Sequence, residues 1–308
     1  MYLNSKIEMK QKAIKLALIG AGNVATHLGK KLAESGYPIL QVYSRTAISA
    51  QTLANAMNAV YTNEHPSVKG MKGENDGKNS LQTSNLDNFN VSYCSWTNLI
   101  EQITPDADLY LVMLKDAVLD DVLPQLVKRN PKALFVHTAG SVPMNIWEGL
   151  AERHGVLYPM QTFSKGRAVD FEQVHFFVEA NSEADLELLK ELAGHLSSKV
   201  FEASSEQRKY LHLSAVFACN FTNHMYAICD KLLTEHGLPF SSMFPLIDET
   251  AQKIHTMNPV DAQTGPAQRY DTNVMQRQEQ LLASDQQVAE IYHLVSEHIH
   301  SYETERKK

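Results

Sequence analysis

A short glycine-rich segment near the start of the chain has the spacing of a phosphate-binding loop. Residues 20–25 read GAGNVA and directly follow the apolar run Ile14–Ile19. Gly20 permits a tight turn, Gly22 lets backbone N–H groups approach a diphosphate, and the small Ala25 lets a helix pack closely on the strand. A strand, turn and helix in this order predict a dinucleotide site. Its predicted residues here are Gly20, Gly22, Asn23 and Val24.

The end of the next apolar run, residues 39–43, indicates which dinucleotide is bound. An NAD site usually carries Asp or Glu there, which accepts hydrogen bonds from the ribose hydroxyls. Here the run is followed by Ser44, Arg45 and Thr46, with no acid. A guanidinium makes charge-assisted hydrogen bonds to a 2′-phosphate, whereas a carboxylate would repel it. The three residues therefore predict NADP as the cofactor. The alternative is that Arg45 is a solvated surface charge.

A group of polar side chains falls on one long predicted helix, residues 204–236. At 100° per residue, a stripe of four side chains falls within about 60° around the helix axis: Arg208, His212, Cys219 and Asn223. Asn220 lies about 80° from His212. In one interpretation these groups only bond to neighbouring helices. In the other, His212 gives a proton to a carbonyl or imine that receives hydride, Asn220 orients the substrate and Asn223 binds it. An imidazole suits this role because it exchanges protons near neutral pH.

The elements that must position these groups form two domains. Up to about residue 201, short apolar runs alternate with amphipathic stretches, which is typical of parallel strands connected by helices. We predict an α/β Rossmann domain with a doubly wound parallel sheet over residues 13–203, and we expect Asp116 to cap one of its helices. The predicted strands are Ile14–Ile19, Ile39–Tyr43, Leu109–Leu114, Leu134–His137, Val156–Tyr158, Phe176–Glu179 and Lys199–Phe201.

The remainder, residues 204–308, predicts an all-helical domain that binds substrate and forms a dimer. Its helical periodicity breaks at residues 237–239 and 258–266. Thr264, Gly265 and Pro266 look like a helix start in which Thr264 is the cap, and the free N–H groups there could hold a substrate carboxylate. Arg269 follows and is a candidate substrate ligand. The alternative is a structural turn without a ligand.

One segment, residues 63–90, is rich in Gly, Asn, Ser and Lys and has few apolar residues. It cannot bury enough apolar surface to offset the entropy of ordering. We predict a mobile surface insertion in the nucleotide domain, with a functional lid as the alternative.

Composition excludes several other classes of function. The 28 Lys and Arg against 35 Asp and Glu give a net charge of −7 over 308 residues, which argues against nucleic acid as a partner. No apolar run is long enough to span a membrane and the N-terminus has no signal-peptide pattern, so we expect a cytoplasmic protein. The three cysteines and the C-terminal histidines lack metal-ligand spacing, so we expect neither a metal nor a disulfide framework.

Taken together, these segments resemble a known family. It comprises Rossmann-like proteins labelled NADP oxidoreductases, with a C-terminal helical domain of uncharacterised function, and it lies near pyrroline-5-carboxylate reductase and the 6-phosphogluconate and β-hydroxyacid dehydrogenases. The resemblance covers nearly the whole chain from residue 14 onward, except the insertion. The matching blocks are IGAGNVATHL, VYSRT, DLYLVMLKDAVLDDV, FVHTAGS, YPMQTFS, YLHLSAVFACNFTNHMYA and AQTGPAQRYD.

The resemblance implies further site residues. Leu114 follows a strand and is expected to line the cofactor cleft, and Thr138 is expected in a turn against the nicotinamide. Gln161 would bond the carboxamide or the substrate. His137 is either part of this turn or a structural histidine at a strand end. The catalytic Lys of the β-hydroxyacid dehydrogenases cannot be carried over, because Lys209 lacks an Asn four residues later.

We therefore predict an NADP(H)-dependent oxidoreductase that transfers hydride to or from a small carbonyl or imine at the domain junction. We expect a homodimer formed through the C-terminal helices. One alternative is a dinucleotide-binding sensor or regulatory protein without turnover. Another is an oxidoreductase that links NADP to a deazaflavin.

Overall fold

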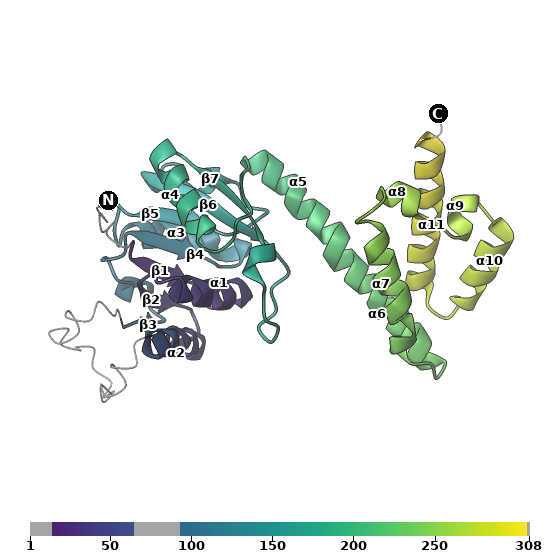
Figure 1. Ribbon diagram of the computed structural model, residues 1–308, viewed down its shortest axis with the longest axis horizontal. Helices are drawn as coiled ribbons and strands as arrows, with labels where there is room; N and C mark the ends of the chain where they lie inside the picture. The colour runs from purple at the N-terminus through teal and green to yellow at the C-terminus, as the bar shows by residue number, and fades with distance from the viewer. Residues whose placement is uncertain (1–13, 65–92, 307–308) are drawn as a thin grey trace, which may run out of the picture. The chain divides into compact units, whose positions relative to one another are not determined.

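The computed structural model describes residues 14–64 and 93–306. The chain forms two compact units, Met1–Phe217 and Ala218–Lys308 (Figure 1). Their boundary falls inside the long helical stretch, 14 residues beyond the boundary predicted after residue 203, and the predicted domain limits stay a prediction. Of the predicted insertion, only Asn63 and Glu64 at the end of a helix are described, and the rest lies outside the described residues.

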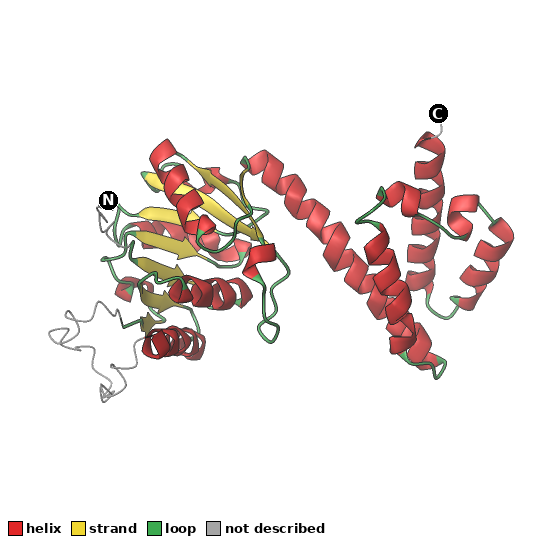
Figure 2. Ribbon diagram, in the orientation of Figure 1, coloured by secondary structure: helices red, strands yellow, loops and turns green. Residues whose placement is uncertain are grey.

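Within the described residues, the first unit is built on one eight-stranded sheet (Figure 2). The strand order is β3-β2-β1-β4-β5-β6-β7-β8, so the direction of winding reverses between β1 and β4. This order confirms the predicted doubly wound α/β fold of the Rossmann type. The strands are β1 (Leu16–Ile19), β2 (Ile39–Tyr43), β3 (Ser95–Thr97), β4 (Leu109–Val112), β5 (Leu134–His137), β6 (Arg153–Met160), β7 (His175–Ala180) and β8 (Val200–Glu202).

The sheet differs from a fully parallel one at its last two strands. Strands β1 to β6 are parallel to one another, whereas β7 pairs antiparallel with β6, and β8 runs parallel to β7. The 14-residue connection 161–174 links the end of β6 to the start of β7, and β7 then runs back alongside β6 in the opposite direction. The prediction of parallel strands is therefore wrong for β7 and β8, because apolar runs do not encode the direction in which a strand enters the sheet.

Helices cover both faces of the sheet. Alternate side chains of β1 point to opposite sides, so Leu16 and Leu18 join one buried cluster while Ala17 and Ile19 join the other. The first cluster packs against α1, α2 and α4, and the second against α3. The helices of this unit are α1 (Asn23–Glu34), α2 (Ala47–Glu64), α3 (Leu119–Val127), α4 (Glu183–Gly194) and α5 (Ser205–Ala215).

The long predicted helix begins as expected but is not uniform. Ser204 caps α5, and Ser204 and Gln207 form a reciprocal capping box. After α5 the backbone adopts a π-helix over Val216–Phe221 and then returns to an α-helix. The second unit is helical throughout its ordered elements, in line with the prediction. They are α6 (Thr222–Glu235), α7 (Phe244–Lys253), α8 (Pro259–Ala262), α9 (Pro266–Arg269), α10 (Thr272–Leu281) and α11 (Gln286–Arg306).

Two predicted caps are wrong. The carboxylate of Asp116 accepts a hydrogen bond from the Ser141 hydroxyl, while α3 begins at Leu119 without a side-chain cap. In the second unit, Gly265 and not Thr264 is the N-cap of α9, with φ of 107°. Only glycine adopts that backbone conformation readily, so the glycine takes the capping position.

No helix within 14–64 or 93–306 is long and apolar enough to cross a membrane. Of the three cysteines, Cys94 is buried, and burial raises the pKa of its thiol to about 12, while Cys219 and Cys229 are exposed. All three are free thiols in the structure.

Candidate functional site

The phosphate loop lies between β1 and α1, at the carboxyl edge of the parallel strands. Gly20 has φ of +125°, and a Cβ there would lie 2.4 Å from the carbonyl oxygen of Met113. A side chain at this position would therefore collide with the end of β4. Gly22 is the N-cap residue of α1, and no protein atom lies within 4 Å of the position of its missing Cβ. The turn thus leaves an open space directly in front of a helix N-terminus.

The start of α1 is electrostatically suited to an anion. No side chain caps the helix, and its first turn contains no acidic residue. The N–H groups of a first turn point out of the helix and carry the positive end of the helix dipole. These features fit the diphosphate of a dinucleotide, because the backbone can approach it without a side chain between.

The segment after β6 is tethered to this helix start. The Asn23 side-chain amide donates to the carbonyl oxygen of Phe163 at 2.8 Å, and Nε2 of His27 lies 2.9 Å from the carbonyl oxygen of Ser164. The predicted role of Asn23 in binding cofactor stays a prediction, and in the structure its side chain holds this segment. Lys165 and Arg167 are exposed in the turn that follows.

The residues predicted to choose the cofactor follow β2 at the same edge. Ser44 is half-buried, and its N–H donates to the carbonyl oxygen of Thr97 at 3.2 Å. Arg45 and Thr46 are exposed in the turn before α2. The structure records no ion pair for Arg45 among the described residues, so its guanidinium is available to a ligand.

The ends of β4 and β5 complete this edge. Leu114 is half-buried, and its Cδ2 lies 3.5 Å from the position that a Cβ of Gly20 would occupy. The Leu114 side chain therefore adjoins the phosphate loop, and its role in lining the cofactor cleft stays a prediction. Thr138 is buried after β5, and its N–H donates to the carbonyl oxygen of Val112 at 3.1 Å.

His212 lies against the turn that follows β5. Its Nδ1 is 3.4 Å from the hydroxyl oxygen of Tyr158, and the two rings meet edge to face with centroids 6.2 Å apart. A Cβ on Gly140 would lie 2.7 Å from Nδ1 of His212 and 2.8 Å from Cζ of Tyr158. Only a glycine allows this approach, so the turn 138–140, the end of β6 and helix α5 meet at His212.

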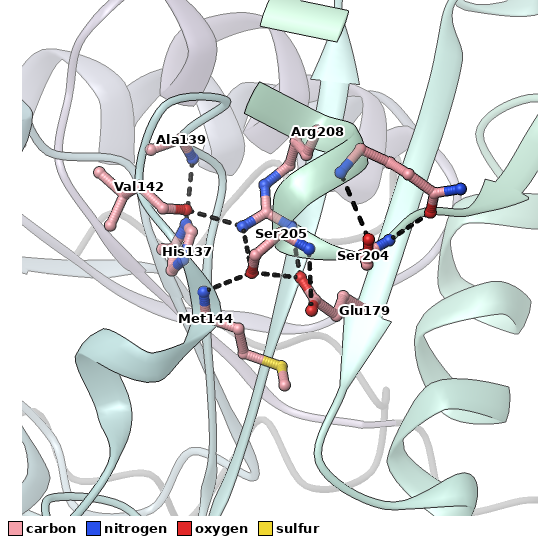
Figure 3. Close-up of polar contacts among 9 residues, drawn as sticks. His137, Ala139, Val142, Met144, Glu179, Ser204, Ser205 and Arg208 are labelled. Carbon is pink, nitrogen blue, oxygen red and sulfur yellow. Dashed lines mark hydrogen bonds and ion pairs between the residues drawn. The ribbon is translucent and has the colours of Figure 1, made fainter. Parts of the chain in front are cut away.

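A buried ion pair fixes α5 to the sheet (Figure 3). Arg208 has no exposed surface, and Nη1 pairs with the carboxylate of Glu179 on β7. Its Nη2 donates to the carbonyl oxygen of Val142 at 2.7 Å. The Ser205 hydroxyl accepts from the N–H of Met144 and donates to Glu179. The first turn of α5 is thereby bonded both to β7 and to the loop after β5, one turn before His212.

His137 at the end of β5 is structural. Its Nδ1 accepts a hydrogen bond from the N–H of Ala139 at 3.2 Å, and its ring lies near the ring of Trp147. Burial and the positive charge of Arg208 lower the pKa of His137 to about 3. The imidazole is therefore neutral at physiological pH, with its proton on Nε2.

The other predicted substrate residues are exposed in the structure. Gln161 is exposed, and its Oε1 accepts from the N–H of Thr162 at 2.8 Å. The second unit holds the remaining four, which are exposed: Asn220, Asn223, Thr264 and Arg269. The spacing of 100° per residue does not hold through the π-helix, so the predicted helical face of Asn220 and Asn223 is not kept. Their roles stay predictions.

Two features of the site were missed from the sequence. Tyr158 was noted only as part of the segment YPMQT, although its place beside the end of a central strand could have suggested a contact with the neighbouring turn. Arg208 was placed in the polar stripe of the long helix without a named partner, and in the structure it is buried against Glu179. An acidic residue inside an apolar strand, as Glu179 is, signals a buried partner.

A cavity of the first unit lies apart from the predicted site residues. The described residues contain no cluster of three or more His, Cys, Asp or Glu side chains that could hold a metal ion. A cavity of about 1110 Å³ lies along α4 and the turn that follows α1, and is lined by Tyr37, Glu191 and His195 among others. It contains none of the predicted site residues.

Comparison with known proteins places the chain in a family. The putative NADP oxidoreductase BF3122 from Bacteroides fragilis is 45% identical, with a TM-score of 0.79, over 94% of this chain and 98% of that chain. The chain belongs to this NADP oxidoreductase family. Residues 174–299 also match the family described as a domain of unknown function, DUF2520. No curated protein matches the chain at a significant level.

Solved structures with lower sequence identity also share the fold of this chain. Protein TM1727 from Thermotoga maritima is 19% identical over 95% of this chain and 100% of that chain, with a TM-score of 0.63. The imine reductase from Myxococcus stipitatus in complex with NADP⁺ is 14% identical over 94% of this chain and 93% of that chain, with a TM-score of 0.59. At these identities the comparison shows the fold.

Proposed function

We propose that this protein binds NADP(H) at the carboxyl edge of its sheet and transfers hydride to or from a small carbonyl or imine substrate. The observation that carries the proposal is the glycine turn before α1, which opens onto an uncapped helix N-terminus in a chain of this oxidoreductase family. The turn fits a diphosphate, and Gly20 and Gly22 are the positions at which any side chain would obstruct it.

Arg45 supports NADP over NAD. It lies in the exposed turn after β2, where the ribose of an adenosine binds in this fold, and no acidic residue stands in that turn. Its guanidinium would neutralise a 2′-phosphate and hydrogen-bond to it, with Ser44 and Thr46 as additional donors. Lys165 and Arg167, on the turn tethered to α1, add positive charge near the diphosphate.

The chemistry of the site follows from His212 and the turn beside it. Bound NADPH would supply a hydride to the electrophilic carbon of the substrate. In the same step, Nε2 of His212 would give its proton to the carbonyl oxygen or imine nitrogen, which leaves an alcohol or an amine. Thr138 and Gly140 line the turn against which the nicotinamide is proposed to rest. Asn220, Asn223, Gln161, Thr264 and Arg269 are the proposed substrate-orienting residues.

Calorimetry with the two reduced nucleotides tests the cofactor assignment. Arg45→Ala should weaken NADPH binding at least tenfold and leave NADH binding nearly unchanged. Lys132→Ala is the control, because it removes an exposed positive charge just before β5, at the opposite edge of the sheet. Equal losses for both nucleotides would refute the role of Arg45, and no heat with either nucleotide would refute the proposal as a whole.

Turnover is tested with panels of small carbonyl compounds and imines, by following NADPH absorbance. His212→Ala should lower kcat by about 10²–10⁴ with little change in NADPH affinity. Binding of NADPH without oxidation across both panels would favour a sensor or regulatory protein. Oxidation only after addition of a deazaflavin would favour that cofactor as the hydride partner.

We also propose that the protein is a homodimer through its C-terminal helices. Large apolar side chains at intervals of four residues are exposed on the helix that contains α5 and α6, which supports a covered face. They are Leu213, Phe217, Phe221 and Met225. Sedimentation equilibrium should give twice the mass of the chain, and a monomer at micromolar concentration would contradict the proposal.

A further inference from the structure

Tyr158 has a position that the proposed function does not yet use. It lies near the carboxyl end of β6, only 8% exposed, and its hydroxyl reaches Nδ1 of His212 from an element 54 residues away in the sequence. The hydrogen bond is long at 3.4 Å, as is common for catalytic groups before a substrate binds. A buried hydroxyl beside an imidazole nitrogen is suited to control where that imidazole carries its proton.

The surrounding packing leaves the two rings little freedom. Gly140 closes the site from the side of the β5 turn, since even a methyl group there would approach both rings to below 3 Å. On the other side, the ring of Phe177 on β7 lies 6.4 Å from the ring of Tyr158. The ring of His212 is therefore held with Nδ1 toward Tyr158.

Helix α5 cannot carry His212 away from this position without breaking a buried ion pair. Arg208 precedes His212 by one helical turn, and it is bonded to Glu179 and to the carbonyl oxygen of Val142. Val142 belongs to the same loop as Gly140. The loop and the helix therefore keep a fixed spacing, and the contact between Tyr158 and His212 is a property of the fold.

The second ring nitrogen is free for chemistry. Within the described residues, Nε2 of His212 makes no hydrogen bond. It is not one of the buried polar atoms that lack a partner, so it is accessible. His212 is half-buried, so Nε2 is the nitrogen that solvent or a substrate can reach.

We propose that Tyr158 is a positioning residue that fixes the tautomer of His212, an inference that rests on the proposed function. The Nδ1–H group donates to the hydroxyl oxygen of Tyr158, so that Nε2 is the nitrogen that exchanges protons. When hydride reaches the substrate carbon, the Nε2–H bond breaks and the proton bonds to the substrate oxygen or nitrogen. The imidazolium becomes a neutral ring with its proton on Nδ1, and solvent returns a proton to Nε2.

Nitrogen-15 NMR of the labelled full-length protein reads this tautomer directly, at a pH where the ring is neutral. His212→Asn identifies the signals of His212 by their loss. In the wild type, Nδ1 should carry the proton. In Tyr158→Phe, which keeps the ring and removes only the hydroxyl, Nδ1 loses its acceptor and the Nε2–H form should become the major one.

Phe177→Leu is the matched control, because it alters packing on Tyr158 and leaves the hydroxyl in place. This variant should keep the wild-type tautomer. Tyr158→Phe should also lower kcat roughly 10- to 100-fold, less than His212→Ala, with the KM for NADPH within about twofold of wild type.

A wild-type ring with its proton on Nε2, or a spectrum unchanged in Tyr158→Phe, would overturn the inference even if turnover fell. The NMR result does not depend on turnover. If neither carbonyls nor imines oxidise NADPH while the tautomer shifts as expected, the proposed function fails and the assignment of the tautomer to Tyr158 stands.

Discussion

The two units of the molecule differ in how much of their apolar surface is covered. The α/β unit contains two buried clusters, one on each face of its sheet. In the helical unit, the described residues that are buried are only Ala267, Met275, Leu282 and Ser296. Large side chains there stay exposed, among them Leu281 at 82% and Leu294 at 70%.

The difference shows where each unit obtains its stability. A domain with a filled interior gains most of its folding free energy from burial within its own chain. A helical unit with so little interior gains less, and its exposed apolar side chains favour association. The comparison therefore predicts that the α/β unit responds to changes in its interior, whereas the helical unit responds to changes on its surface.

The largest expected effect is the loss of the buried cation of the α/β unit. Arg208→Ala leaves Glu179 without its ion-pair partner and should lower the free energy of unfolding by about 3–5 kcal/mol. Urea denaturation measures it. The neighbouring Lys209→Ala breaks an exposed pair with Glu206 and should cost no more than about 1 kcal/mol. Similar losses in both variants would contradict the picture of a tightly filled interior.

A smaller effect is expected where the interior is already full. Gly140→Ala forces a methyl group against His212 and Tyr158, and should destabilise the protein by about 1–3 kcal/mol. Gly194→Ala adds the same methyl group at the end of α4, where no atom lies within 4 Å, and should be neutral or slightly stabilising. Thermal unfolding compares the two variants. If Gly140→Ala unfolds at the wild-type temperature, the turn has spare room.

For the helical unit, the expected effect is on association. Phe221→Asp with Met225→Asp places charges among exposed apolar side chains and should raise the dimer dissociation constant by tenfold or more, because a charge is costly to bury. Sedimentation equilibrium measures this constant, and circular dichroism checks that the helices remain. A dimer as tight as the wild type would place its interface elsewhere.

The last expected effect is a pH dependence of the α/β unit. His137 has a folded-state pKa of about 3, so between pH 3 and about 6.5 the unfolded chain binds a proton that the folded chain does not. Stability should therefore fall as pH decreases through this range, by up to about 1.4 kcal/mol per pH unit.

His137→Asn removes this contribution, since Asn does not titrate and can still accept from the N–H of Ala139. Urea denaturation measures the free energy of unfolding of both proteins between pH 7.5 and pH 4.5, on the order of one measurement per pH unit. The difference between the two curves is the contribution of His137, because the other histidines titrate in both proteins. Parallel stability curves would show that His137 is not buried as described.

The sequence predicted those parts of the fold and site that depend on neighbours in the chain. The turn at Gly20 and Gly22 is local, since it needs only a strand before it and a helix after it. The start of the long helix near residue 204 was predicted correctly for the same reason. Asp116 and Thr264 were expected to cap helices by residue type, but a closer bond to Ser141 and the backbone freedom of Gly265 decided otherwise.

The parts that were missed depend on contacts across the sheet. The direction of β7 is set by the connection 161–174 and by its pairing with β6, which no periodicity reveals. Arg208 looked like one member of a polar stripe because its partner, Glu179, is 29 residues away. Tyr158 and His212 meet only because the turn between their elements has a glycine, and that requires the folded arrangement.

The positions of the three cysteines allow the helical unit to be observed on its own. Cys94 is enclosed in the α/β unit and does not ionise at neutral pH, whereas Cys219 and Cys229 are exposed in the helical unit. A maleimide dye applied to the folded protein should therefore label the helical unit alone. Its fluorescence would report on that unit during nucleotide titration, without any engineered cysteine.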